Sequence, residues 1–237
     1  MSLFERLVEP LYVTDTRLPL SVLETQRRMY PSIAELIRST LYPSLKDADK
    51  VAKYPGVIGI KKRLFWFYHE QPEAGTTDHD PLSTSHSNEF EVEMTITLVS
   101  YLVRQGEYSR SDITVITPYL GQLQRLRRRM ETMFKIYLND RDQEQVEALE
   151  ADGPEVLEPT PRAQLAKTTL AKSIRIATVD NFQGEEAKVI VICLVRSNPQ
   201  NNCGFLRTSN RINVLLSRAQ HRMYIIGNAN TYRGIRM

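Results

Sequence analysis

Apolar residues follow two different spacings along the chain, and each spacing predicts one type of element. Nearly continuous apolar runs at residues 174–179, 188–195 and 223–227 are typical of parallel strands that are covered on both faces. From Phe90 to Leu102, by contrast, an apolar residue recurs at every fourth position, which predicts a helix with one apolar face. Further strands are predicted at residues 64–68 and 112–117, and further helices at 120–138 and 211–218. Because strands and helices alternate, we expect an α/β domain with a parallel sheet and helices on both faces.

Particular residues refine two of these elements. Asn88 followed by Glu91 is typical of a helix N-cap and its partner three residues on, and Gly106 is placed to end that helix. The run at residues 64–68 is rich in aromatic side chains and is predicted to be a buried strand. Its central side chains are therefore expected in the core: Phe65, Trp66 and Phe67.

The pattern changes between residues 139 and 166, where acidic residues and prolines replace the apolar spacing. We expect the tail of the preceding helix there, followed by a mobile surface loop, because so few apolar residues cannot support packing. The chain shows no internal repeats. At 237 residues it is long enough to bury a sizeable core, and residues 1–237 are predicted to form one domain.

Composition limits the compartment and the partners. Hydrophobic residues make up 41% and charged residues 25%, as in soluble globular proteins, and the longest apolar run is too short to span a bilayer. Two cysteines, Cys193 and Cys203, form neither a disulfide framework nor a zinc spacing, and the four histidines do not cluster with other potential ligands. With charged residues and no signal peptide at the N-terminus, we expect an intracellular protein, cytoplasmic or nuclear, without a metal site of its own and without membrane contact.

Charge alone does not indicate a partner, since the net charge is only +3. Most basic residues are arginines, which grip phosphates as a planar fork. They bunch at one place in particular: Arg125, Arg127, Arg128 and Arg129. Such a bunch is more often a solvated helix face than a binding site, and contact with a nucleic acid is the alternative.

Four segments resemble, in order, the C-terminal motor half of the Upf-type superfamily 1 RNA helicases. They are LETQRRMYPSI from Leu23, VITPYLGQLQRL from Val115, IATVDNFQGEEAKVIVICLVRSN from Ile176 and NRINVLLSRAQHRMYIIGN from Asn210. They look like the segment after motif III and motifs IV, V and VI, and together they frame residues 23–228. SLFERLV from Ser2 and QRRMYP from Gln26 are most similar to the helicases with NFX-type zinc fingers, some linked to RNA silencing. The resemblance implies a RecA-like fold and a 5′-to-3′ ATP-dependent RNA helicase.

Two motifs of such helicases do not occur in the sequence. No glycine is followed by lysine, as a P-loop requires to hold phosphates, and no aspartate is followed by glutamate, as a Walker B pair for Mg²⁺ requires. The resemblance therefore implies the second motor domain, whose partner is the first RecA domain of the same protein. ATP and Mg²⁺ would be held mainly by that first domain, and this chain alone is predicted to be inactive.

The resemblance assigns two arginines to catalysis, Arg28 in QRRMYP and Arg218 in LLSRAQ. Such arginine fingers stabilise the charge of the transferring phosphoryl group and contribute about 10³- to 10⁵-fold in rate. Arg218 is expected to follow a helix that is anchored in the core, with its guanidinium pointing outward. The alternative for either arginine is a structural role, in which it caps a helix or pairs with a surface carboxylate. The resemblance further implies nucleotide-binding roles for Arg27, Gln183, Gly184 and Glu186, with Glu186 on the ribose. Gly184 equally fits a plain turn, and Asp180 fits a structural acid of that loop.

Single-stranded RNA is expected at the ends of two strands. Hydroxyls and backbone amides there can bind phosphates without reading sequence. The candidate residues are Thr117, Pro118, Tyr119, Thr178 and Val179. Tyr119 equally fits a packing role, and Gln122, one helical turn further on, fits the nucleotide or the RNA side.

Two other functions stay open on the sequence. One is a free-standing RecA-like module that binds RNA or a protein without catalysis. The other is part of a DNA-specific helicase, because telling RNA from DNA requires contacts to the 2′-hydroxyl that the motifs do not locate.

Overall fold

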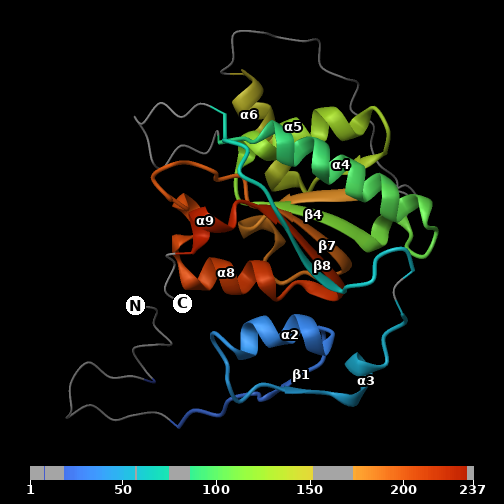
Figure 1. The fold of residues 1–237 in the computed structure, drawn as a ribbon, viewed down its shortest axis with the longest axis vertical. Coiled ribbons are helices and arrows are strands. Elements are labelled where there is room, and N and C mark those ends of the chain that lie inside the picture. Colours follow the sequence, from blue (N-terminus) through green and yellow to red (C-terminus); the bar gives the residue numbers. More distant parts are fainter. Residues whose placement is uncertain (1–7, 9–18, 57, 75–85, 152–172, 234–237) are drawn as a thin grey trace.

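One parallel sheet organises the domain (Figure 1). The computed structural model describes residues 8, 19–56, 58–74, 86–151 and 173–233. Six strands lie in the order β3-β8-β7-β4-β6-β5, and each neighbouring pair is parallel. Their bounds are Leu64–Tyr68 (β3), Ile113–Thr117 (β4), Ile136–Tyr137 (β5), Ile174–Thr178 (β6), Ala187–Cys193 (β7) and Ala219–Gly227 (β8). A shorter parallel pair joins β1 (Thr25–Gln26) to β2 (Lys46–Asp47).

Helices cover both faces of the sheet, as the alternation of strands and helices predicted. They are α2 (Pro31–Arg38), α3 (Asp49–Ala52), α4 (Glu89–Arg104), α5 (Leu120–Glu131), α6 (Asp140–Ala151), α8 (Ser209–Leu216) and α9 (Ala229–Tyr232), with 3-10 turns η1 (Arg110–Asp112), η2 (Asp180–Phe182) and η3 (Gly204–Arg207). Helices α4 and α5 lie on one face, and α8 and α2 lie on the other (Figure 1). The predicted α/β class is confirmed.

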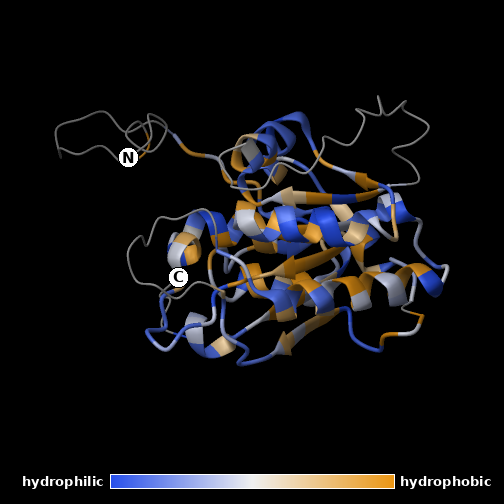
Figure 2. Ribbon diagram, turned by 90° about the horizontal axis from the view of Figure 1, so that it is seen from above, coloured by the Kyte–Doolittle hydropathy of each residue, from blue (hydrophilic) through white to orange (hydrophobic). Residues whose placement is uncertain are grey.

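The two faces bury two separate cores, because side chains alternate between the faces of each strand. Val115, Ile176 and Val191 pack with α4 and α5, while their neighbours Ile116 and Ile192 pack with α2 and α8. Apolar colour therefore concentrates in the strands and on the inward sides of the helices (Figure 2). None of the helices in the described ranges is both long and apolar enough to cross a membrane.

Helix α4 confirms the predicted helix but buries a different face. Asn88 accepts a hydrogen bond from the Glu91 amide at 3.2 Å, as an N-cap does, and Gly106 follows the helix with φ of 73°. The buried apolar residues are Val92, Ile96, Val99 and Leu102, whereas Phe90, Met94 and Leu98 are only half-buried. A strict four-residue repeat rotates around a helix of 3.6 residues per turn, so a mixture of three- and four-residue steps stays on one face.

Strand β3 forms where predicted, but its burial was predicted wrongly. Phe65 is 43% exposed, and Trp66 and Phe67 are each 38% exposed. The reason is position, since β3 pairs only with β8 and lies at the edge of the sheet. The aromatic run is therefore a partly covered edge and not core; the Trp66 indole donates to the Gly227 carbonyl at 3.0 Å.

The segment after α5 also differs from the prediction. Helix α5 ends at Glu131, strand β5 adds to the edge of β6, and α6 then begins as a separate helix. Asn139 starts α6, because its side chain accepts a hydrogen bond from the Asp142 amide at 2.7 Å. The expected helix tail is thus a new helix, and the expected loop at 152–166, like residues 2–7 of the N-terminal motif, lies outside the described residues.

Candidate functional site

A cleft opens at the carboxyl ends of β4 and β6, where parallel α/β sheets commonly bind ligands. Its volume is about 780 Å³. It is lined by residues of four segments: Pro118, Tyr119, Leu120, Arg141, Gln145, Thr178, Asp180, Asn181, Asn202, Gly204, Phe205, Arg207, Thr208 and Arg211. Of the five residues predicted to bind RNA, Pro118, Tyr119 and Thr178 line this cleft. Thr117 and Val179 are buried at 0% and 1% exposure, and the Val179 amide donates to the Thr117 carbonyl at 3.2 Å.

Thr178 does not offer its hydroxyl to the cleft. The Thr178 amide and hydroxyl both donate to the carboxylate of Asp142, at 3.2 and 2.8 Å. Asp142 is 0% exposed and also accepts from the side chain of Asn181 at 2.6 Å. The expectation that the Thr178 hydroxyl and amide bind phosphate therefore conflicts with this geometry. The role of Asp142 was not predicted from the sequence, although Asn139 followed three residues later by an acidic residue is typical of a helix start.

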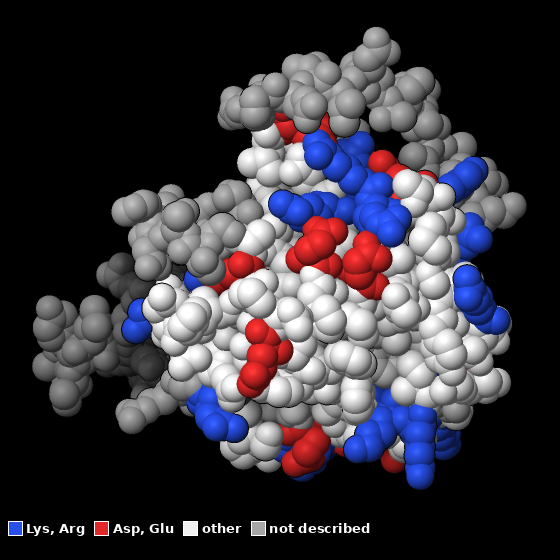
Figure 3. Space-filling model, turned by 45° about the horizontal axis from the view of Figure 1, so that its top comes forward, with Lys and Arg blue, Asp and Glu red and all other residues white. Residues whose placement is uncertain are grey.

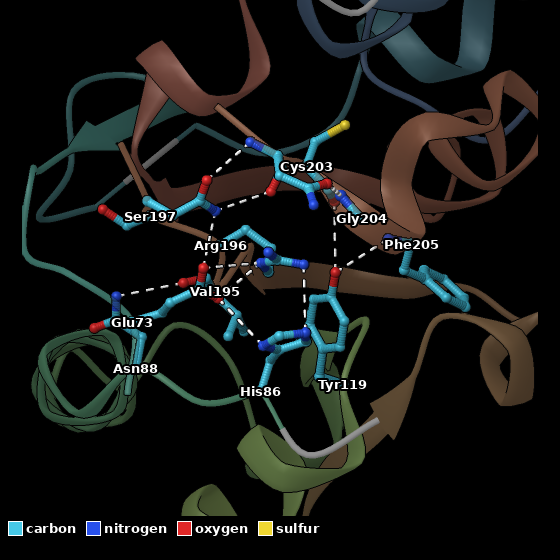
Figure 4. Close-up of polar contacts among 12 residues, drawn as sticks. Glu73, His86, Asn88, Tyr119, Val195, Arg196, Ser197, Cys203, Gly204 and Phe205 are labelled. Carbon is cyan, nitrogen blue, oxygen red and sulfur yellow. Dashed lines mark hydrogen bonds and ion pairs between the residues drawn. The ribbon is translucent and has the colours of Figure 1, made fainter. Parts of the chain in front are cut away.

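Tyr119 ties the loop after β7 to the start of α5 (Figure 4). Its ring is 4% exposed, and its hydroxyl accepts from the Phe205 amide at 3.1 Å while lying 3.4 Å from the Cys203 carbonyl. Its ring also lies edge-on to His86, with centroids 5.1 Å apart. This geometry is that of the packing role left open for Tyr119.

Beside Tyr119 lies a buried charge pair that no sequence motif indicated. Arg196 pairs with Glu73 at 2.7 Å, and their side chains are 6% and 3% exposed (Figure 4). Burial by itself would lower the pKa of Arg196, but Tyr119 and Glu73 stabilise the charged form and raise it. The Asn198 side chain donates to Glu73 at 2.8 Å, so the same carboxylate also fixes the turn after β7. An arginine directly after a buried apolar strand was the available signal.

Val195, between β7 and Arg196, has a left-handed backbone with φ of 72°, which is uncommon for a β-branched residue. Its amide donates to both carboxylate oxygens of Glu91, at 3.0 and 2.9 Å, and the Asn88 side chain donates to its carbonyl at 3.4 Å. Glu91 is fully buried, and that burial raises its pKa. A backbone of this kind costs about 1–3 kcal/mol, so these bonds hold a strained turn at the edge of the site.

Gln122 belongs to this scaffold and not to a ligand site. It is 0% exposed, its oxygen accepts from the Asn88 amide at 2.8 Å, and its nitrogen donates to the Asn88 carbonyl at 3.2 Å. Both polar ends of its amide are therefore engaged by one backbone unit. The prediction that Gln122 reaches nucleotide or RNA is wrong for this arrangement.

A second group of residues, which we name the arginine wall, consists of Arg28, Glu186, Arg218 and Gln220. Arg28 Nε binds Glu186 Oε2, and Arg28 Nη1 donates to the Ser217 carbonyl at 3.0 Å. Gln220 donates to the other oxygen of Glu186 at 2.7 Å. Burial would raise the pKa of Glu186, but the hydrogen bonds from Arg28 and Gln220 outweigh it and lower the pKa.

Arg218 is held by backbone carbonyls. Helix α8 ends at Leu216, so Arg218 lies in the turn before β8 and not in the helix. Its Nε donates to the Val214 carbonyl at 2.7 Å and its Nη1 to the Glu185 carbonyl at 3.3 Å. The guanidinium is therefore folded back onto the protein and only half-exposed, in contrast to the outward orientation that was expected. Burial and the neighbouring charge of Arg28 lower its pKa.

The structure leaves the other nucleotide candidates at the surface. Arg27, Gln183 and Gly184 are exposed. Gly184 has φ of 88°, and a Cβ there would meet no atom within 4 Å, so the turn and not a close approach requires the glycine. The fold thus brings Arg28, Glu186 and Arg218 together. Gln183 and Gly184 lie on the loop that carries Glu186.

The fold is that of an α/β domain with a parallel sheet, and it carries the cleft and the arginine wall. A family model described as "AAA domain" matches residues 1–230, and the chain belongs to this family. It is 35% identical to human "NFX1-type zinc finger-containing protein 1" over 96% of this chain and 9% of that protein. It is 30% identical to "Helicase required for RNAi-mediated heterochromatin assembly 1" of Schizosaccharomyces pombe, over 97% of this chain and 18% of that protein.

A third relative is "Putative ATP-dependent RNA helicase ECM32" of Saccharomyces cerevisiae, 29% identical over 90% of this chain and 19% of that protein. The resemblance to superfamily 1 helicases that the four sequence segments indicated is confirmed. The chain is a motor domain of the superfamily 1 helicases. It spans less than a fifth of the length of each of these three relatives.

Proposed function

We propose that this chain is the second motor domain of an ATP-dependent superfamily 1 RNA helicase. The observation that carries the proposal is the arginine wall, in which Arg28 and Arg218 flank Glu186 on fixed backbone supports. A fixed guanidinium suits catalysis because its charge is aimed before the reaction begins.

The wall fits a polyphosphate anion. Both arginines use Nε and Nη1 within the protein, while neither Nη2 donates to any group in the part of the chain that the structure describes. Burial and, after it, repulsion from Arg28 lower the pKa of Arg218, and phosphate oxygens would offset that repulsion. In this proposal Arg28 and Arg218 bind the phosphates and Glu186 accepts hydrogen bonds from the ribose, while Arg27, Gln183 and Gly184 lie beside the base and phosphates. ATP supplies the phosphoanhydride bond whose cleavage drives the motor.

The P-loop, the Walker B acid and most Mg²⁺ ligands would come from a first RecA domain of the same protein. The cleft would hold single-stranded RNA through Pro118, Tyr119 and the loop of Thr178. Residues 178–186 run from this cleft to the arginine wall, so one loop contacts both sites. A change at the nucleotide can therefore reach the strand through a continuous segment.

ATP turnover tests this proposal. The 237-residue chain is compared with a two-domain protein, in which the chain follows its P-loop-bearing first domain. We expect turnover only by the two-domain protein and only with single-stranded nucleic acid present. Turnover by the chain alone would contradict the proposal.

A second outcome separates the alternatives. RNA binding by a two-domain protein that cannot turn over ATP would favour a non-catalytic binding module. Equal salt-dependent binding of RNA and DNA oligonucleotides, or tighter binding of DNA, would contradict the RNA assignment.

A further inference from the structure

We infer that helix α6 forms one wall of the path for single-stranded nucleic acid, with Arg141 binding a phosphate and Gln145 supporting it. The inference rests on the proposed function and adds to it residues that the motifs do not contain. It begins from the cleft, which Arg141 and Gln145 line together with Pro118 and Phe205.

Helix α6 is anchored along its length, so its cleft-facing side chains have a fixed base. At its start, the Asn139 side chain donates to the Asn181 carbonyl at 3.1 Å, and Asp142 holds the amide and hydroxyl of Thr178. In its middle, Val146 is fully buried in the core that includes α5. Near its end, Glu150 accepts from Gln124 of α5 at 3.2 Å.

The face of α6 that is not anchored points into the cleft. Arg141 and Gln145 are one helical turn apart and both are exposed, whereas Asp142 and Val146, each the next residue along, are both 0% exposed. The helix thus turns one polar face to the cleft and one anchoring face to the domain. Packing alone would not require an arginine at position 141.

Two of the three cleft arginines have no carboxylate partner among the residues that the structure describes. Within the described residues, neither Arg141 nor Arg207 forms an ion pair, and Arg211 lies 3.9 Å from Asp180 while stacking 3.7 Å above the Phe205 ring. The arginines of α5 are paired instead, for example Arg128 with Glu150 at 3.3 Å. On the face of α4 and α5, basic and acidic side chains lie side by side (Figure 3). An unpaired arginine keeps its charge and its fork of donors for a phosphate.

The hydrogen bonds of Asp142 also support a phosphate-binding role for Arg141. Because Asp142 takes both the amide and the hydroxyl of Thr178, this strand end offers few donors to a phosphate. The same helix brings the cation of Arg141 to the lining of the cleft. Helix α6 thus removes one phosphate-binding group and supplies another.

Fluorescence anisotropy tests the inference on the full 237-residue chain. The probes are fluorescein-labelled oligouridine and oligothymidine of about 12 nucleotides, a length within the usual site size. Arg141→Ala is compared with Arg128→Ala, a matched arginine whose charge is already paired. Salt is varied between about 50 and 200 mM, because each phosphate contact on a single strand contributes about 0.7 to the logarithmic salt slope.

We expect Arg141→Ala to weaken binding by about 3- to 10-fold and to lower the salt slope by about 0.7. Arg141→Lys should restore the slope, and Arg128→Ala should match the unaltered chain. Unchanged thermal unfolding of Arg141→Ala would show that the exposed side chain acts on the ligand. Wild-type affinity and slope in Arg141→Ala, with the unaltered chain binding well, would overturn this inference alone. Failure of the unaltered chain to bind either probe would overturn the assignment of the cleft to nucleic acid and the inference with it, whereas ATP turnover by the two-domain protein tests the motor role separately.

Discussion

The arginines of the wall and the arginines of the cleft are held in opposite ways. In the wall, Arg28 and Arg218 each donate two hydrogen bonds to groups of the protein; three of the four acceptors are backbone carbonyls within 3.3 Å, and the fourth is the Glu186 carboxylate. In the cleft, Arg141 and Arg207 have no ion pair within the described residues, and Arg211 is steadied by stacking on Phe205. Both sets are cationic, but in the wall both guanidinium groups are fixed by hydrogen bonds, whereas Arg141 and Arg207 form no ion pair with any residue that the structure describes.

This difference matches two kinds of task. A group that stabilises a transition state must be placed to within about 0.5 Å, so fixed hydrogen bonds are useful there. A group that holds a nucleic-acid backbone without reading sequence needs charge and reach more than direction. We therefore expect variants of the wall to reduce turnover and variants of the cleft to reduce affinity, with little exchange between the two effects.

Arg218→Ala in the two-domain protein should give the largest effect. We expect ATP turnover to fall by about 10³-fold or more, because the charge that stabilises the transferring phosphoryl group is lost. Measured at saturating RNA, the loss should appear in kcat, while RNA affinity and its salt slope stay unchanged.

Arg218→Lys provides the matched control for this variant. It keeps the charge but cannot make the two bonds to Val214 and Glu185 that fix the guanidinium. It should remain strongly impaired. Normal ATP turnover in Arg218→Ala would show that Arg218 has no catalytic role. It would also contradict the assignment of turnover to the arginine wall and of affinity to the cleft.

The fold was predictable where burial is continuous. Strands β4, β6, β7 and β8 were found because their apolar runs are covered on both faces. Strand β3 has a similar apolar run in the sequence, yet its side chains are partly exposed because the strand lies at the edge of the sheet. The order of strands in a sheet is not determined by the local sequence, so this exposure could not be predicted from the run. Helix α6 was not separated from the preceding helix because it buries few apolar residues and is anchored largely by polar bonds.

The candidate site was predictable only where a motif carried it. Arg28, Glu186 and Arg218 are far apart in sequence, and the resemblance to helicase motifs placed them at one site that the structure brings together. The partner of Thr178 is Asp142, 36 positions earlier in the chain, and nothing near Thr178 indicates it. Likewise Glu73 and Arg196 are 123 positions apart, so the charge pair under Tyr119 follows from the tertiary fold alone.

Asp142→Ala tests whether α6 connects the cleft to the loop that leads to the wall. It leaves the backbone amide and hydroxyl of Thr178 and the side-chain amide of Asn181 without their shared acceptor. Because hydrogen bonds to a buried charge are worth about 1.5–3 kcal/mol, we expect the free energy of unfolding to fall by about 3 kcal/mol. Chemical denaturation measures this loss. Glu144→Ala, at an exposed position of the same helix, should change the stability little; equal stability of the two variants would contradict the anchoring role.

Removing two cleft charges together should produce a smaller effect, confined to affinity. The double variant Arg141→Ala, Arg207→Ala should bind single-stranded RNA at least about tenfold more weakly, with a salt slope lower by about 1.4. In the two-domain protein, kcat at saturating RNA should be unchanged. Arg125→Ala with Arg128→Ala removes the same charge from α5, where both residues are paired with glutamates. A similar loss from the α5 pair would show that total charge, and not the absence of a partner, decides affinity.

The smallest expected effect concerns the carboxylate at the centre of the wall. The pKa of Glu186 is lowered in the folded protein, so its charged form favours folding above the ordinary glutamate value of about 4.3. This contribution is lost as the pH falls through the lowered pKa. Since the Glu186 side chain is 44% exposed, the contribution should be below about 1 kcal/mol. The difference in unfolding free energy between the unaltered chain and Glu186→Gln should therefore favour the unaltered chain at pH 7 and vanish once the pH has fallen below the lowered pKa of Glu186. A pH-independent difference for Glu186→Gln would mean that shape alone, without charge, holds Arg28 in the wall.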